Sequence, residues 1–467
     1  MKRFIGGLLA LALACAGGAL AVLGASNPAA PVPVEAVEVP PAPLAVSCGG
    51  ELERTYDGGV DVADVAESIE ERSWVVAFPT SGTAPDVTVS GGRDVPRVGD
   101  LGFLSEEAGL AGVVETGTVD PGSLELAGGT VHTAAGGDLR GLATNPCLRA
   151  SLDQWLVGSR AQVGVSNQLI LTNPGPNPSA VEVEALTATG LAPLGTAATT
   201  VVDAGETKRI SLDGSLQDEQ RFALHITADS GGVAASMQQT SLDGYTPNGV
   251  TFVTPTVASE ELTIPGVKID DADGSATLRI ANPASKPVTV DVSTIDADGK
   301  RDLPGGTDVT VEAGSVLDLN LQGLPAGEVS LEISASDEVV AGAEFTATSG
   351  EAVDNAWVAA RPAASSGSAV FGQVQASLVA VSHEGKATVT AYPVDADGAP
   401  MDPVRAEVDG QGVLQLPEGA VAVRYEASTP VSAGLITTVG FDDGTGVDWV
   451  PLGSSNIEEA SRRVSIG

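Results

Sequence analysis

The stretch Leu169–Gly214 occurs twice in this sequence, and its repetition decides the fold. The first copy opens with LILTNPGPNPSAVEVEAL and closes with VVDAGETKRISLDG. The second copy, Leu278–Gly323, opens with LRIANPASKPVTVDVSTI and closes with VTVEAGSVLDLNLQG. The two copies align without a gap at an offset of 109 positions. Because one small all-β domain takes about 100 residues, the chain is predicted to be a tandem array of such domains.

Two kinds of turn recur in both copies. Proline lacks the N–H of a strand ladder and holds the residue before it extended, so an Asn-Pro pair ends a strand. A glycine between two strand-like runs supplies the positive φ of a hairpin turn. The predicted structural turns are therefore Asn173-Pro174, Asn282-Pro283, Gly205 and Gly314.

Weaker copies of the pattern extend the array. The run GVDWVP (446–451) matches GVTFVT (249–254), and LEISA (331–335) matches FALHITA of the preceding copy. Short strand-like runs with frequent turn signals, and no long helical pattern, indicate β-sandwiches. Each sandwich is expected to have its own core, so that residues 151–257 fold alone. The predicted domains are 48–149, 150–257, 258–357 and a degenerate 358–456, followed by a tail, 457–467.

The sequence is strongly acidic, with 61 Asp and Glu against 23 Lys and Arg and a formal net charge of −38. Nucleic acids and anionic lipid surfaces are bound by clusters of Lys and Arg. The charge therefore excludes nucleic acid as the expected partner. It favours a soluble surface that faces the outside of a cell.

Residues 1–25 contain a basic MKR start and an uncharged apolar run, Phe4–Ala25. A secretory signal core takes about 7–15 residues and a membrane span about 20. The run is therefore predicted to stay as a single-pass anchor with its basic end in the cytoplasm. Two alternatives stay open: cleavage near the ALA tripeptide 19–21, which gives a secreted protein, and lipidation of Cys15. Residues 26–47 are rich in proline and are predicted to form an extended stalk.

Cys48 and Cys147 are the only cysteines after the apolar run. In an oxidising compartment two such cysteines are expected to pair. The predicted disulfide brackets the first domain and closes a loop of about 100 residues.

The sequence contains no catalytic or cofactor-binding motif. His132, His225 and His383 are predicted to be surface residues, although a Ser-His-Asp site is recognised by geometry and not by sequence. Asp271 and Asp273 lie in a DDADG cluster similar to a calcium loop, but the cluster lacks the glycine and the glutamate that an EF-hand needs. Asp and Gly also favour tight turns, so a turn is predicted there and calcium remains the weaker alternative.

One tryptophan lies near the edge of each predicted domain. A sugar-binding face needs exposed aromatic residues that are grouped together. A single tryptophan in each domain instead favours packing in a core or at a junction. The four are Trp74, Trp155, Trp357 and Trp449.

The repeated pattern LxLxNPxxxPxxVxV…VxAGxxxxLxL resembles bacterial immunoglobulin-like (Ig-like) domains. With the apolar N-terminal segment and the cysteine before DQWLVGS (153–159), the chain is similar to a family of secreted or membrane-anchored actinobacterial proteins without an assigned activity. The resemblance covers most of residues 140–451, and the first domain matches only through Cys147. It implies location and architecture rather than chemistry. Genes of that family tend to lie beside an envelope glycosyltransferase.

The sequence thus predicts an all-β chain of tandem Ig-like β-sandwiches behind an N-terminal apolar helix and a Pro-rich stalk. The expected role is structural or partner-binding in the cell envelope, without catalysis and without a cofactor. The expected partner is an envelope protein or a glycan, and the N-terminal segment provides the contact with the membrane. Two alternatives remain: an accessory subunit of a membrane glycosyltransferase, and a hydrolase whose site carries no sequence mark.

Overall fold

The computed structural model describes residues 42–53, 69–120, 122–244, 246–270, 275–349 and 352–453. Within these residues the protein is all-β with antiparallel strand pairs, and its one helical element is the 3-10 turn η1 (Gly195–Ala197). None of the described segments forms a helix long and apolar enough to cross a membrane. The predicted anchor, 1–25, lies outside the described residues, as does the predicted stalk up to residue 41.

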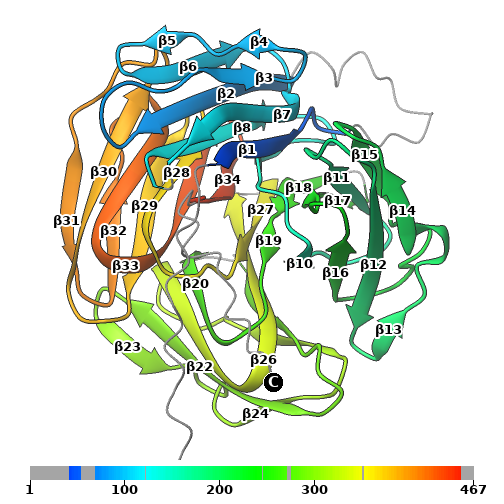
Figure 1. Cartoon of the computed structure of the whole chain (residues 1–467). Coiled ribbons are helices and arrows are strands. Elements are labelled where there is room, and N and C mark those ends of the chain that lie inside the picture. Colours follow the sequence, from blue (N-terminus) through cyan, green and yellow to red (C-terminus); the bar gives the residue numbers. More distant parts are fainter. Residues whose placement is uncertain are drawn as a thin grey trace, which may run out of the picture. The chain divides into compact units, whose positions relative to one another are not determined.

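Module 1 has two sheets (Figure 1), and a cluster of buried apolar side chains lies between them. The sheet orders are β1-β7-β3-β4 and β5-β6-β2-β8-β9. Residues 42–47, predicted as the end of the stalk, belong to β1, because alternate residues such as Leu44 and Val46 pack into this core. The strands are β1 (Ala42–Gly49), β2 (Ile69–Pro79), β3 (Val87–Val89), β4 (Arg93–Asp94), β5 (Arg97–Val98), β6 (Leu101–Glu106), β7 (Ala111–Val119), β8 (Leu124–Ala134) and β9 (Gly141–Pro146).

Module 2 contains the first copy of the repeat. Its sheet orders are β13-β12-β16-β10-β19, with β14 on β12, and β15-β11-β17-β18. In β12 the buried Val181 and Val183 alternate with the exposed Glu182 and Glu184, the period of a strand with one face on a core. The strands are β10 (Asp153–Val157), β11 (Val165–Thr172), β12 (Ser179–Thr187), β13 (Gly190–Ala192), β14 (Thr199–Val202), β15 (Thr207–Ser211), β16 (Phe222–Ala228), β17 (Ala234–Asp243), β18 (Thr246–Val253) and β19 (Pro255–Thr256).

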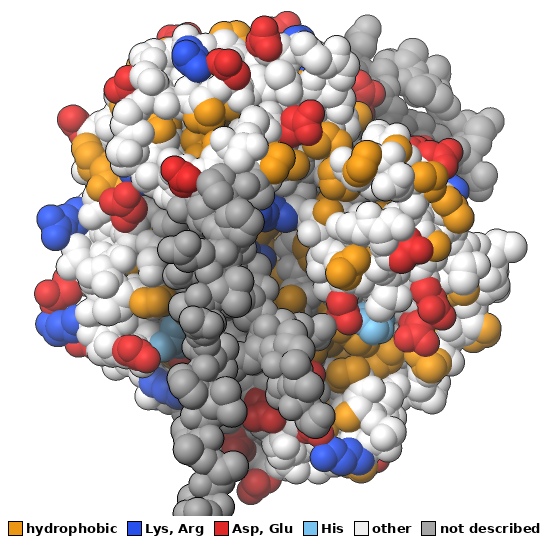
Figure 2. All heavy atoms as spheres, viewed as in Figure 1, with side chains coloured by type: hydrophobic (Ala, Val, Ile, Leu, Met, Phe, Trp, Pro, Cys, Tyr) orange, Lys and Arg blue, Asp and Glu red, His pale blue; other side chains and the backbone are white. Residues whose placement is uncertain are grey.

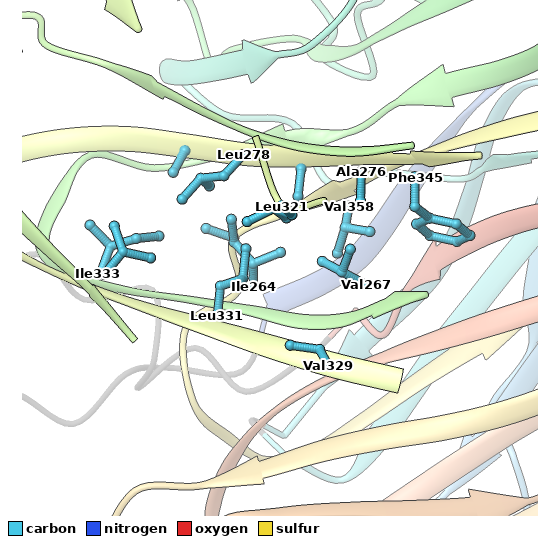
Figure 3. Packing of buried hydrophobic residues seen from close by; sticks show 14 of the residues in the cluster. Ile264, Val267, Ala276, Leu278, Leu321, Val329, Leu331, Ile333, Phe345 and Val358 are labelled. Carbon is cyan, nitrogen blue, oxygen red and sulfur yellow. The ribbon is translucent and has the colours of Figure 1, made fainter. Parts of the chain in front are cut away.

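Module 3 contains the second copy, and its long strand β26 serves both layers. The first half of β26 pairs with β20 and β22, and the second half pairs with β21 and β27. Figure 3 shows Ile264, Leu278, Leu331, Ile333 and Phe345 within the buried cluster between the layers. The strands are β20 (Ser259–Ile269), β21 (Ala276–Ala281), β22 (Val288–Asp296), β23 (Gly299–Asp302), β24 (Val309–Val311), β25 (Val316–Asn320), β26 (Gly327–Ser349) and β27 (Ala352–Ala359).

Module 4 repeats this plan. Its long strand β33 pairs first with β28 and β30, and then with β29 and β34. The strands are β28 (Ala364–Val370), β29 (Gln375–Ser382), β30 (Ala387–Asp395), β31 (Val404–Val408), β32 (Gln411–Gln415), β33 (Ala420–Phe441) and β34 (Gly444–Pro451).

The two copies of the repeat have the same strand register. Leu169 faces Ile210 across β11 and β15, and Leu278 faces Leu319 across β21 and β25. Leu169 and Leu278 are both fully buried. Each pair of equivalent residues is separated by the offset of 109 that the sequence gives, so the sequence repeat is also a structural repeat.

Figure 1 shows β18, β27 and β34, from modules 2, 3 and 4, near the centre of the unit Pro41–Gly467, and β9 of module 1 contacts β18 and β34. We call these four strands, β9, β18, β27 and β34, the axial strands. β18 contacts β9 and β27, and β34 contacts β27 and β9, so the contacts close into a propeller-like ring. The four modules that the tandem array was predicted to contain are therefore in contact with one another around a closed ring. Each module presents one side to the core of the ring.

Cys48 on β1 and Cys147, which follows β9, form a disulfide across a sequence separation of 99. The bond links the first strand of module 1 to the end of its axial strand. We expect the double variant C48A/C147A to lose about 2–4 kcal/mol of unfolding free energy, because the open chain gains conformational entropy when it unfolds. Denaturant unfolding of the variant and of the wild type, each with and without reductant, measures the loss. If the unfolding free energy of the wild type is the same with and without reductant, the predicted stabilisation by the disulfide is wrong.

Candidate functional site

The axial strands enclose two buried aspartates, Asp354 on β27 and Asp448 on β34. Oδ2 of Asp354 accepts hydrogen bonds from the backbone N–H groups of Leu142 and Val447, both at 2.9 Å. Its Oδ1 accepts a third from the N–H of Asn355 at 3.0 Å. Leu142 belongs to β9 and Val447 to β34. One carboxyl group therefore joins three of the four axial strands.

Asp448 on β34 connects the fourth axial strand, β18, to the others. Its Oδ2 accepts a hydrogen bond from the backbone N–H of Thr144 on β9 at 2.6 Å. Its Oδ1 accepts one from the hydroxyl of Thr251 on β18 at 3.4 Å. Neither axial aspartate was predicted. The signal that marks Asp448 in the sequence is an acidic residue inside an otherwise apolar strand, GVDWVP.

Burial controls the protonation of the axial aspartates. It raises the pKa of Asp448 to about 7, although hydrogen bonds from the backbone of Trp449 and from Thr144 act in the other direction. Burial also raises the pKa of Asp354, and the neighbouring Asp448 adds to this rise. Carboxyl pairs hydrolyse glycosides only where a sugar reaches them. Since these two side chains are at most 1% exposed, their role is to hold the ring together.

The raised pKa of Asp448 gives a pH-dependent stability that Asp448→Asn removes. The folded pKa of about 7 lies above that of an unfolded aspartate. Stability from the neutral carboxyl is therefore complete at low pH and is lost as pH rises from about 4 to about 7. The amide has the same shape and no charge. We expect D448N to match the wild type near pH 4 and to exceed it by about 1–3 kcal/mol at pH 8.

Urea unfolding of D448N and the wild type at both pH values measures this difference. A wild type that is more stable than D448N at pH 8 would contradict the neutral state of the carboxyl.

A second polar cluster has the order of a hydrolase triad. The hydroxyl of Ser432 lies 3.0 Å from Nε2 of His383. Nδ1 of the same ring lies 3.3 Å from Oε1 of Glu332. The hydrogen bond from His383 is the main reason that the pKa of Glu332 falls to about 2, and Lys300 assists against the opposing effect of burial. Sequence reasoning did not bring these residues together.

The direction of the hydrogen bonds in this cluster does not suit a nucleophile. Ser432 is 1% exposed, and its hydroxyl donates to the backbone carbonyl of Arg361 at 2.9 Å. Its oxygen then accepts from His383, whereas a nucleophilic serine donates to its base. Glu332 belongs to module 3, and Ser432 and His383 belong to module 4. The cluster therefore connects two modules.

The prediction that all histidines lie at the surface is wrong for His132. This side chain is buried, with Nε2 3.4 Å from the carbonyl oxygen of Leu139. The ring of His225 stacks on Trp155 with a centroid distance of 4.2 Å. Nε2 of His225 lies 3.3 Å from a carboxylate oxygen of Asp153. The imidazole rings of His132 and His225 thus take part in packing between strands.

The tryptophans join modules, as the junction interpretation predicts. Trp357 of module 3 packs into the core of module 2, and its indole N–H donates to Oε1 of Gln239 at 3.0 Å. Trp449 of module 4 packs into the core of module 3 and donates to a backbone carbonyl there at 2.9 Å. Trp74 lies in a cluster shared by modules 1 and 4, and Trp155 in one shared by modules 2 and 3.

The asparagine side chains of the Asn-Pro turns are buried, although most of the residues that follow them are exposed. Asn173 and Asn282 are 0% exposed. In each turn Oδ1 accepts the N–H two residues later at 2.8 Å. Nδ2 donates to the carbonyl four residues later, at 2.8 Å from Asn173 and 2.9 Å from Asn282. The two asparagine side chains, followed by Pro174 and Pro283, therefore build the turns from within.

The glycine and aspartate turns are also structural. Gly205 and Gly314 have φ values of 73° and 61°, the left-handed conformation that favours glycine. Asp271 and Asp273, the weak calcium candidates, lie outside the described residues. Across the described ranges there is no group of three or more His, Cys, Asp or Glu side chains placed to hold a metal ion.

No curated protein matches this chain. Two solved structures are similar to it at a low level. A Streptomyces avermitilis alpha-L-rhamnosidase complexed with L-rhamnose is 10% identical with a TM-score of 0.14, and the match covers 81% of this chain and 54% of that one. The chain thus spans about half the length of the rhamnosidase. The BSP domain of a biofilm associated protein is 8% identical with a TM-score of 0.11, covering 89% and 96%.

Neither similarity supports a statement about fold or function at such TM-scores. The family comparison is more informative, because one family model matches residues 106–417, more than half of the chain. The protein therefore belongs to the family of unknown function DUF5719.

Proposed function

We propose that this protein is a non-catalytic component of the cell envelope that presents the outer surfaces of a closed ring of modules to a partner. One observation carries the proposal: the buried polar groups that resemble catalytic sites are used to connect modules. Asp354 and Asp448 join the axial strands, and His383 of module 4 with Glu332 of module 3 joins modules 3 and 4. Figure 2 shows acidic side chains spread over the visible face, which suits a soluble outer surface.

The modules are further proposed to be Ig-like sandwiches of the actinobacterial type that the sequence resembles. The seven strands of module 4, arranged in two antiparallel layers, support this assignment.

The apolar segment 1–25 is proposed to anchor the ring to the membrane, or to direct its secretion. An anchor raises the effective concentration of the ring near an envelope partner. Retention in membranes through a high-salt wash, followed by release with detergent, tests the anchor.

Crosslinking in intact cells tests the proposed function. We compare the wild type with D354A, which opens the ring, and with the surface variant D298A at equal protein amounts. Partner capture is expected to be lost in D354A and kept in D298A. Equal capture by all three would overturn a role for the closed ring. A captured glycosyltransferase would assign the protein as an accessory subunit, whereas a captured polysaccharide would identify a glycan partner.

A hydrolase is the second candidate, because Ser432, His383 and Glu332 lie in triad order. We expect full-length protein to release no p-nitrophenol from p-nitrophenyl acetate above background, and S432A to behave identically. Wild-type hydrolysis that falls by about 10³-fold or more in S432A would establish the hydrolase instead. S368A, which changes a serine outside the cluster, controls for nonspecific effects of the substitution.

A further inference from the structure

A cavity of about 180 Å³ lies where the chain leaves the axial strands. Residues that follow all four axial strands line it: Arg149, Pro255, Arg361 and Gly453. Most of the remaining wall is apolar and comes from β1, β8, β28 and the end of β34. The cavity thus combines apolar walls with two arginines, in a chain whose net charge is −38.

Arg361 brings a positive charge to this cavity and has no carboxylate partner within the part of the chain that the structure describes. Its side chain is half-buried, and the one hydrogen bond of its guanidinium to a described residue is from Nη2 to the carbonyl oxygen of Leu452 at 3.3 Å. No Asp or Glu among the described residues forms a salt bridge with it. Burial lowers its pKa, a sign that its charge is poorly solvated. A guanidinium has five N–H donors, so most of those of Arg361 remain to bind a ligand.

The charge of Arg149 is balanced within the protein. Glu125, which is 2% exposed, lies close enough to raise the pKa of Arg149 against the lowering by burial. The same carboxylate accepts a hydrogen bond from the hydroxyl of Ser366 at 2.6 Å. Counting the described residues, the cavity therefore carries one positive charge that no carboxylate balances, that of Arg361.

We infer that this cavity binds a small organic carboxylate, with the carboxylate on the guanidinium of Arg361 and the hydrocarbon part against the apolar wall. A planar guanidinium fork matches the two oxygens of a carboxylate. One positive charge neutralises a monocarboxylate, whereas a phosphate dianion would need two. The volume is also suitable, because an apolar cavity of about 150 Å³ holds benzene.

Calorimetric titration of the full-length protein with benzoate tests this inference. We expect a Kd near 1 mM, the scale of a ligand with about nine heavy atoms. Benzyl alcohol, which has the ring without the charge, is expected to bind at least about tenfold more weakly, because a hydrogen bond to a charged group is lost. Inorganic phosphate is expected not to compete. Equal affinity for benzoate and benzyl alcohol, or stronger binding of phosphate, would overturn carboxylate recognition.

Variants then assign the binding to Arg361. R361M is expected to weaken benzoate binding by at least about tenfold, and R361K to retain part of it because a point charge replaces the fork. R405M removes an exposed arginine elsewhere in module 4 and is expected to bind as the wild type does. Unchanged binding by R361M would overturn the assignment. If R361M fails to fold, R361K and the wild-type ligand series still decide the question.

The carboxylate has two possible sources, since the chain itself continues past Gly453 through Glu458 and Glu459. The full-length variant E458Q/E459Q distinguishes them. Tighter benzoate binding by this variant assigns an internal carboxylate as the competing occupant, and unchanged binding assigns an external ligand. Loss of benzoate binding would overturn the site, because this variant leaves Arg361 and the apolar wall unchanged.

Discussion

Replacement of Asp354 by alanine is expected to lower the free energy of unfolding by about 3–5 kcal/mol. The substitution leaves the N–H groups of Leu142, Val447 and Asn355 buried without their acceptor. The first two belong to other axial strands, β9 and β34, so the loss separates modules 1, 3 and 4 at their common contact. A buried amide without a partner bears the full cost of its lost hydration.

Guanidinium unfolding followed by circular dichroism measures this loss. The matched control is D298A, which removes an exposed aspartate from a turn and is expected to stay within about 0.5 kcal/mol of the wild type. If D354A also stays within that range, Asp354 does not hold the ring together.

Replacement of Trp357 by alanine is expected to cost about 3–5 kcal/mol and to lower the melting temperature of more than one module. The indole of this module 3 residue is 2% exposed and lies in the core of module 2. It donates to Gln239 at 3.0 Å, and the guanidinium of Arg279 lies 5.1 Å from its ring centroid. Removing it leaves a cavity between two modules and an unpaired amide.

Differential scanning calorimetry tests this coupling. We expect the wild type to unfold in one transition and W357A to unfold in one transition at a lower temperature. V413A shortens a partly exposed side chain of module 4 and is expected to change little. A W357A transition that splits off module 2 alone would contradict the coupling. Such a result would support the expectation that residues 151–257 fold alone. The position of Trp357 in the core of module 2 argues against that expectation, because residues 151–257 do not include this tryptophan.

Local chemistry determined the strands and the turns of the repeat, and the sequence by itself was sufficient for these, although not for β1, which was predicted as stalk. The alternation of Val181 and Val183 with glutamates predicts which face of β12 is buried, because side chains point to opposite faces with a period of two. Gly205 is predicted as a turn because only glycine adopts positive φ without strain. Asn173 is predicted to end a strand because a proline follows it. The offset between the two copies then sets the size of a module.

Only the tertiary structure decided which modules meet and which strands are buried on both of their faces. His132 was predicted at an outward position, yet β8 is buried on both faces: Leu124 and Leu126 lie in the core of module 1, and Ala127 and Val131 lie in the cluster shared with module 4. Asp354 contacts the N–H of Leu142 across a sequence separation of 212, and Thr144 contacts Asp448 across 304. Periodicity describes one strand and its own sheet. The periodicity of a strand does not indicate whether another module packs against its outer face. The ring is closed by contacts of this kind between modules.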